Sequence, residues 1–235
     1  MGPDAVGSDR IATDVMITGA GLPLVQPFAR ELLRQRSAGA LLFHGNTRRC
    51  AALAQANPCD AVHHNLLLTR QVLQVVISSG TASFAFLSSD QALQTHTVLG
   101  ASFAAAEASV LEAGQLCPDL AIAVVRFPGQ LQPIQPDGLP LELAWRQETA
   151  ARAAVAAITA NTRQLVLSWP DPLGAPHELA RQPLRQAVPL PQLPLIDWLQ
   201  QVSDPLQAYQ HNTVARALLN LWSQPNSAAL SAPLR

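Results

Sequence analysis

The sequence contains no lysine, because all fifteen of its basic residues are arginine. Charged residues make up 13% of the chain and the formal net charge is −1, whereas a typical soluble domain has about 25% charged residues. The absence of lysine excludes any mechanism that needs a catalytic lysine. The chain also lacks the excess positive charge that phosphate backbones and anionic membranes select for. We therefore expect no nucleic-acid partner.

Cysteine and long apolar runs are also scarce. The three cysteines, Cys50, Cys59 and Cys117, have no C-x-x-C spacing, which argues against a disulfide framework and against a zinc site. No stretch reaches the roughly 18 uninterrupted apolar residues of a membrane span, and the first fourteen residues do not resemble a secretion signal. We expect a cytoplasmic protein that binds no metal and does not insert into a membrane.

Apolar residues, at 49% of the chain, are sufficient for a sizeable core. Short apolar runs alternate with stretches of helical spacing, an order that predicts an α/β fold built on a parallel sheet. The expected strands are 14–21, 40–44, 83–87, 120–127 and 164–169, with a further extended segment at 141–145. The expected helices are 25–36, 57–80, 100–113, 148–160, 196–201 and 206–221.

Proline and small polar residues suggest where this domain begins and ends. We expect a flexible tail over 1–13, an α/β domain over 14–181, a proline-rich linker over 182–195, C-terminal helices over 196–223 and a second flexible tail over 224–235.

Three motifs carry a resemblance to a known family. Residues 43–50 read FHGNTRRC and lead to Asn57-Pro58, residues 84–92 read FAFLSSDQA, and residues 125–127 read VRF. The chain resembles the extended short-chain dehydrogenase/reductases, in the polysaccharide-biosynthesis branch that includes UDP-N-acetylglucosamine 4,6-dehydratases. Members of that branch read F-H-A-A-A-x-K-H, F-V-x-I-S-T-D-K-A and V-R-F at these places. The resemblance runs from about residue 14 to residue 181 and implies a Rossmann-like fold.

The resemblance also implies NAD-dependent chemistry on a sugar nucleotide, but the residues that supply it have changed. The family uses an Asp-Lys pair after a strand and a Tyr-or-Met-x-x-x-Lys motif on the next helix. Here Asp90 remains, while the lysine of the pair is Gln91, the Tyr-or-Met position is Leu99 and the helix lysine is Phe103. A phenyl ring cannot hold the nicotinamide ribose or lower a neighbouring pKa.

The turn that binds the cofactor in the family has also lost residues that binding requires. A G-x-x-G-x-x-G turn lets a pyrophosphate approach the backbone at the start of a helix. Here Gly19 remains, but Leu22 and Val25 stand at the other two glycine positions, and Pro23 lacks an amide donor. In addition, two βα units of the family, on the order of 40 to 60 residues, are missing between the first helix and the strand at 40–44. We expect no bound NAD(P), and a truncated Rossmann-like sheet with the first strand at its edge.

A few polar residues are candidates for what is left of a site. Ser89 and Asp90 are possible catalytic remnants, although a carboxylate at a strand end more often caps a helix. Gly19 and Gly21 are remnants of the cofactor turn. Arg48 and Arg126 are weak candidates for contacts with a nucleotide sugar.

The resemblance implies that two helices, over 61–79 and 100–113, pack against their mates in a second subunit as a four-helix bundle. The residues we expect at this interface are Leu66, Leu73, Val76, Phe103, Ala106 and Val110. Our main interpretation is a catalytically inactive, dehydratase-like protein that acts as a structural or regulatory subunit. Its partner would be a second copy, a related full-length protein or a larger assembly.

Two alternatives remain open at this stage. The first is a module that binds a nucleotide sugar through the loops near Arg48, Asp90, Arg126 and Gln130. The second is an active UDP-sugar 4,6-dehydratase or epimerase in polysaccharide biosynthesis.

Overall fold

The structure is a computed structural model in which residues 14–19, 22–34, 40–45, 47, 49–128, 141–160, 164–169 and 179–222 are described. The two expected tails, at 1–13 and 224–235, lie outside the described residues.

A six-stranded sheet forms the middle layer, and its strands lie in the same order in space as in the sequence. All neighbouring strands are parallel except the last pair, which is antiparallel. The strands are β1 (Val15–Thr18), β2 (Leu41–His44), β3 (Ser83–Ser89), β4 (Ala121–Phe127), β5 (Leu165–Ser168) and β6 (Ala180–Pro183). The predicted truncated Rossmann-like sheet is confirmed, with β1 at one edge beside β2.

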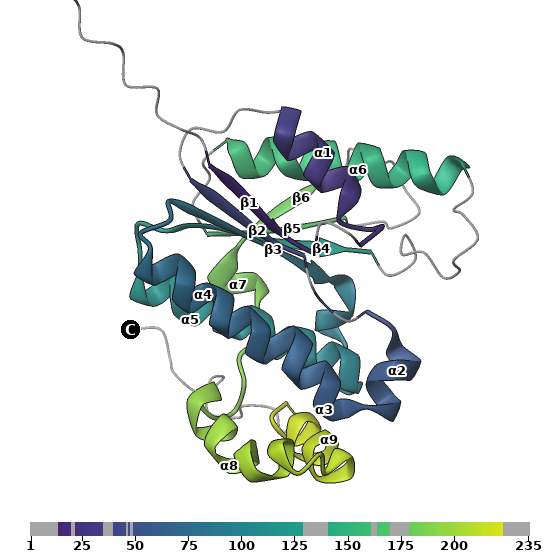
Figure 1. Ribbon diagram of the computed structural model, residues 1–235, viewed down its shortest axis with the longest axis vertical. Helices are drawn as coiled ribbons and strands as arrows, with labels where there is room; N and C mark the ends of the chain where they lie inside the picture. Colours follow the sequence, from purple (N-terminus) through teal and green to yellow (C-terminus); the bar gives the residue numbers. More distant parts are fainter. Residues whose placement is uncertain are drawn as a thin grey trace, which may run out of the picture.

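Helices cover both faces of the sheet, and a helical hairpin adds a further layer beyond α5 (Figure 1). The helices are α1 (Gln26–Arg34), α2 (Ala51–Ala56), α3 (Pro58–Ala61), α4 (Leu68–Ser78), α5 (Val98–Leu116), α6 (Leu141–Thr159), α7 (Leu184–Ala187), α8 (Leu195–Gln207) and α9 (His211–Asn220). A π-helical turn, η1 (Val62–Leu67), joins α3 to α4, and a 3₁₀ turn, η2 (Asp90–Leu93), follows β3.

The sheet separates two apolar cores because successive side chains of a strand point to opposite faces. In β3, Phe84 and Phe86 face the core beneath α4 and α5, whereas Ala85 and Leu87 face the core beneath α1 and α6. The helices α8 and α9 join the first of these cores through residues such as Trp198. Burial on both faces explains why the parallel strands read as continuous apolar runs.

The connections between strands differ in hand. Each connection from β1 to β5 moves one strand further in the same direction across the sheet, but α1 and α6 lie on one face and α4 and α5 on the other. The connections through α1 and α6 are therefore opposite in hand to those through α4 and α5, although nearly all such connections in proteins share one hand. In a doubly wound sheet, strands on the α1 side extend away from β1 in the other direction. The reversed connection through α1 is what remains when those strands are removed.

Several expected elements differ from the observed ones. Residues 141–145 are the first turns of α6 rather than an extended segment, and the expected linker over 182–195 contains the end of β6 and the whole of α7. The helix α2 was not predicted. The helix α8 continues past the predicted end at 201 and contains Pro205, because its buried residues, including Trp198, Val202 and Leu206, keep helical spacing.

Among the helices of the described residues, none has both the length and the apolar character needed to cross a membrane.

Candidate functional site

The crevice between the carboxyl ends of β1 and β2 is where an open α/β sheet of this kind binds ligands. Val25, directly before α1, has 1% of its surface exposed and fills this place. Its Cγ2 atom lies 2.6 Å from where a Cβ atom on Gly45 would stand, and the Thr18 carbonyl oxygen lies 3.3 Å from that point. Residue 45 is therefore glycine because the valine side chain occupies the space beside it.

The turn before α1 also has few backbone donors left for an anion. The amide of Leu22 donates to the Gly19 carbonyl at 2.9 Å, and the amides of Val25 and Gln26 donate to the Leu22 carbonyl at 2.9 and 3.2 Å. The two prolines of this segment, at 23 and 27, have no amide hydrogen. A pyrophosphate normally binds to free amides at this end of a helix, and here these five positions cannot supply one.

Arg49 lies further along the same edge of the sheet, at the end of β3. Its Nη1 and Nη2 atoms donate to the backbone carbonyls of Ser88 and Leu87 at 2.9 and 2.5 Å. Its Cζ atom lies 5.3 Å from the centre of the Phe103 ring, the arrangement of a cation–π contact. Burial lowers the pKa of Arg49 to about 9, and the Asp90 carboxylate opposes this shift. The guanidinium therefore stays charged at neutral pH, over the residue that stands at the family's lysine position.

A buried histidine joins the ends of β1 and β2 to the helix layer. His44 Nδ1 lies 2.6 Å from Thr18 Oγ1, and His44 Nε2 lies 3.2 Å from Thr69 Oγ1. The Thr69 hydroxyl itself donates to the Asn65 carbonyl. Burial lowers the pKa of His44 to about 4, so the ring is neutral at physiological pH. The neutral ring links the strand to the helix layer through its two hydrogen bonds.

A buried ion pair joins β4 to α5. Arg126 on β4 donates from Nε and Nη2 to the two carboxylate oxygens of Glu107 on α5, with the shortest distance 2.5 Å. The Ser88 hydroxyl donates to the same carboxylate at 2.6 Å, and Arg126 Nη2 also donates to the carbonyl of Ala187, at the end of α7. Four segments thus meet at one buried ion pair: Glu107 is bound from β3 and β4, and Arg126 in turn binds the carbonyl at the end of α7.

The predicted site residues are distributed as follows. The Ser89 hydroxyl lies 3.1 Å from Asp90 Oδ1 and accepts from the amide of Gln91, so Ser89 caps the turn η2. Gly19 has a φ of 74°, a conformation that favours glycine. Arg126 is 3% exposed and holds Glu107, so it does not present a free guanidinium to a ligand. Gly21, Arg48 and Gln130 lie outside the described residues.

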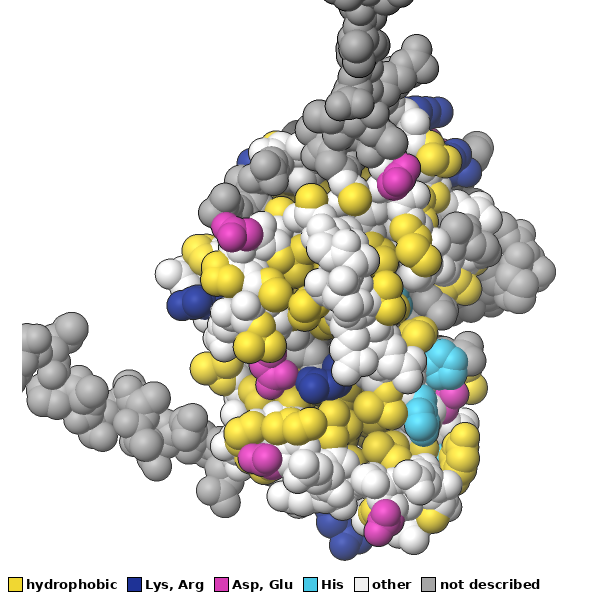
Figure 2. Space-filling view, turned by 60° about the vertical axis from the view of Figure 1, so that its left-hand side comes forward, with side chains coloured by type: hydrophobic (Ala, Val, Ile, Leu, Met, Phe, Trp, Pro, Cys, Tyr) yellow, Lys and Arg dark blue, Asp and Glu magenta, His cyan; other side chains and the backbone are white. Residues whose placement is uncertain are grey.

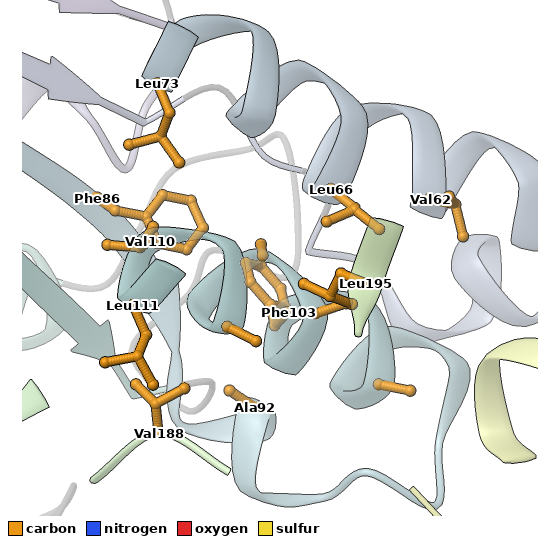
Figure 3. Close-up of a cluster of buried hydrophobic side chains, with 14 of the residues drawn as sticks. Val62, Leu66, Leu73, Phe86, Ala92, Phe103, Val110, Leu111, Val188 and Leu195 are labelled. Carbon is orange, nitrogen blue, oxygen red and sulfur yellow. The ribbon is translucent and has the colours of Figure 1, made fainter. Parts of the chain in front are cut away.

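The six residues expected at a subunit interface belong to the interior of the monomer. Leu66, Leu73, Val76, Phe103, Ala106 and Val110 are each at most 4% exposed and belong to one core. Figure 3 shows Leu66 and Leu73 pointing from their helix toward α5, where Phe103 and Val110 lie. The prediction that these side chains form an interface is corrected: α5 is enclosed by the sheet, α4 and the hairpin α8–α9, so its apolar residues are core residues.

Glu107, which the sequence did not single out as a site residue, organises this region together with Arg49. A signal for Glu107 was present, because an acidic residue within the alanine run at 104–108 and an arginine within an apolar strand each need a partner when buried. No group of three or more metal-ligating side chains occurs among the described residues.

The residues present do not fit a dinucleotide. Val25 fills the crevice, and the amides of Leu22, Val25 and Gln26 donate to carbonyls within the chain. Phe103 stands at the position of the family's ribose-binding lysine and lies against Arg49. The fold and this region together define a Rossmann-like α/β protein whose cofactor crevice is filled by its own side chains.

Comparisons with known proteins agree with the motifs. Residues 30–131 match the family described as "Polysaccharide biosynthesis protein". The probable polysaccharide biosynthesis protein EpsC of Bacillus subtilis is 30% identical over 84 residues, which are 36% of this chain and 14% of that relative's length. The chain is thus a relative of the extended short-chain dehydrogenase/reductases in their polysaccharide-biosynthesis branch.

Solved structures support the same fold. The UDP-glucose 4-epimerase of Thermotoga maritima, solved with UDP-glucose, aligns with a TM-score of 0.52 and 12% identity, over 82% of this chain and 83% of that one. MoeE5, solved with UDP-glucose and NAD, aligns with a TM-score of 0.50 and 14% identity, over 66% of this chain and 75% of that one. These structures bear on the fold alone.

Proposed function

We propose that this protein serves polysaccharide biosynthesis as a non-catalytic relative of the nucleotide-sugar enzymes and acts by associating with another protein chain. The observation that carries the proposal is the valine in the crevice: Val25 and Gly45 fit each other where a dinucleotide would lie. Arg49 and Phe103 support it, because they place a charge and a ring where the family has a lysine. Since cofactor chemistry needs that space, the fold is left with a structural or regulatory role.

The family's helix bundle is one way in which such a subunit could associate, and part of α4 remains available for it. Val75 and Ile77 on α4 and Leu116 at the end of α5 are 57%, 39% and 78% exposed. A groove of about 190 Å³ runs between the two helices and is crossed by the ion pair of Arg70 and Glu112. In Figure 2, which brings the C-terminal ends of these helices forward, hydrophobic side chains surround a few charged groups.

Ligand binding tests the proposal directly. Purified protein should show no saturable binding of NADH by fluorescence titration, and its melting temperature should not rise with NAD, UDP or UDP-N-acetylglucosamine, because a ligand that binds the folded state raises it by mass action. Stabilisation by UDP or UDP-N-acetylglucosamine alone would favour the nucleotide-sugar-binding module. Saturable NADH binding would overturn the filled-crevice argument.

A matched variant makes a negative result informative. Val25→Gly restores the family's glycine and removes the side chain from the crevice. A known NAD-dependent epimerase serves as the positive control. If it binds NADH while wild type and variant both fail to bind, the missing βα units are enough to prevent cofactor binding even without the Val25 side chain. Binding by the variant alone would show that Val25 is the decisive block and would still support the proposal for the natural chain.

A further inference from the structure

The sheet has two edges, and they differ in how they are protected against pairing. Edge strands of natural proteins are commonly protected by charged residues or proline, because their unpaired amides and carbonyls can bind another strand. The outer strand β6 has the sequence ARQP, and its Arg181, Gln182 and Pro183 are exposed. At the other edge, β1 has the sequence VMIT, with neither a charged residue nor a proline. Only the β6 edge carries these protective features.

The outer side of β1 offers backbone groups for pairing. The carbonyls of Asp14 and Thr18 accept from the amides of Leu41 and Gly45, so these residues turn their backbone groups toward β2. Because hydrogen-bonding direction alternates along a strand, Val15 and Ile17 turn theirs away from β2. Among the described residues, β1 pairs with β2 alone.

Large apolar side chains lie exposed on β1 and on the adjoining turn and helix. Met16 on β1 is 61% exposed, Leu22 in the turn 39% and Leu33 on α1 74%. The charged groups of α1 are paired within the chain: Arg34 with Glu31 at 3.6 Å, and Arg30 with Glu148 at 3.1 Å. A second copy brought to this edge would therefore contact exposed apolar side chains, and the charged side chains of α1 near it are already in ion pairs within the chain.

We propose that β1 is a pairing edge for a second copy of this chain, with the two β1 strands antiparallel across a two-fold axis at Met16. This pairing deepens the association proposed above and rests on it. The axis places Val15 opposite Ile17 of the second copy. In this register the outward amide of each of these residues donates to the outward carbonyl of the other. It sets Met16 opposite its own mate, at the roughly 5 Å separation of directly opposed residues in an antiparallel pair. Such a contact is self-complementary and closed, as two-fold interfaces are.

A second copy fits this edge better than an unrelated strand. β1 itself carries no charge and presents the same apolar residues in either copy. The exposed Asp14 that precedes it lies, in this register, opposite Thr18 of the second copy and not opposite its own mate. Its four residues form a short ladder, so the strand pairing alone is weak, and the contact needs the apolar residues around it. Val15 and Ile17 pack against the core beneath α1, so Met16 points to the other face of the sheet. A dimer therefore doubles Met16 on one face, and Leu22 and Leu33 on the α1 face.

The decisive experiment uses opposite charges at one position in the full chain. By sedimentation equilibrium, wild type should show a concentration-dependent dimer of twice 25.0 kDa. Met16→Lys and Met16→Glu should each weaken the dimer by about tenfold or more, because two like charges then face each other. An equimolar mixture of the two variants should recover dimer, since opposite charges now meet. Leu93→Lys, at an equally exposed residue on η2, should dimerise like wild type.

Each outcome decides the proposal. Circular dichroism and melting temperature establish that the Met16 variants are folded, as expected for a change in an exposed side chain. A wild type that stays monomeric overturns the pairing edge, and so does a Met16→Lys variant that dimerises like wild type or a mixture that does not recover dimer. If the Met16→Lys variant dimerises like wild type, association proceeds through another surface and the proposed function still holds. That function itself fails if the separate ligand experiments show binding of NADH, UDP or UDP-N-acetylglucosamine.

Discussion

The Cγ2 atom of Val25 lies 2.6 Å from the position that a Cβ atom on Gly45 would take. A methyl group at residue 45 would clash with a side chain that is itself 1% exposed and held between α1 and the sheet. We therefore expect Gly45→Ala to destabilise the protein by about 1–3 kcal/mol, the usual effect of adding volume to a packed core. The free energy of unfolding from urea denaturation measures this.

A second substitution tests the cause of that loss. Val25→Ala removes both methyl groups that would clash with a Cβ atom on residue 45. The double variant Val25→Ala with Gly45→Ala should therefore be more stable than the sum of the two single effects predicts. A coupling energy of zero in this double-mutant cycle would mean that the two residues do not share the crevice.

The buried pair of Glu107 and Arg126 provides a second prediction. Glu107→Gln leaves the Arg126 guanidinium buried without a counter-charge, and loss of one partner of such a pair costs about 3–5 kcal/mol. Glu112→Gln, on the same helix, removes a partly exposed partner of Arg70 and should cost less than about 1 kcal/mol. Chemical denaturation measures the free energy of unfolding of both variants. Equal decreases in the two would contradict the conclusion that the buried Glu107 carboxylate stabilises the fold more than the partly exposed Glu112.

The sequence predicted most of the sheet because its parallel strands are continuous apolar runs, as in residues 83–87 and 120–127. It also predicted that the strand at 14–21 would stand at an edge, since the missing βα units leave it there. It failed at 141–145, where a helix begins directly after a proline-rich stretch that resembles a loop. The residues around Phe103 illustrate the other limit: their type predicted an apolar helix face, but only the fold shows that the sheet and the C-terminal hairpin, rather than a second subunit, bury that helix.

His44 gives the protein a predicted pH dependence. Its pKa in the folded protein is about 4, below the ordinary value of 6.5, so the unfolded chain binds a proton more readily between these values. Stability should therefore fall as pH decreases from 6.5 to 4, by about 3 kcal/mol for this residue alone. The variant His44→Gln keeps a hydrogen-bonding side chain that does not titrate. If its unfolding free energy falls with pH as steeply as that of wild type, His44 is not responsible.

Two neighbouring residues of α4 separate the core from the surface available for association. Leu73→Glu puts a carboxylate into a core position that is 4% exposed, and we expect loss of the cooperative fold, because an unpaired buried charge costs more free energy than a small domain has in reserve. Val75→Glu changes a residue that is 57% exposed, so the fold should persist with a melting temperature close to that of wild type. Circular dichroism distinguishes the two variants, and sedimentation of the folded one then tests the helix face. A folded Leu73→Glu variant with altered association would return Leu73 to the interface, whereas a folded Val75→Glu variant with unchanged association would remove this part of α4 from it.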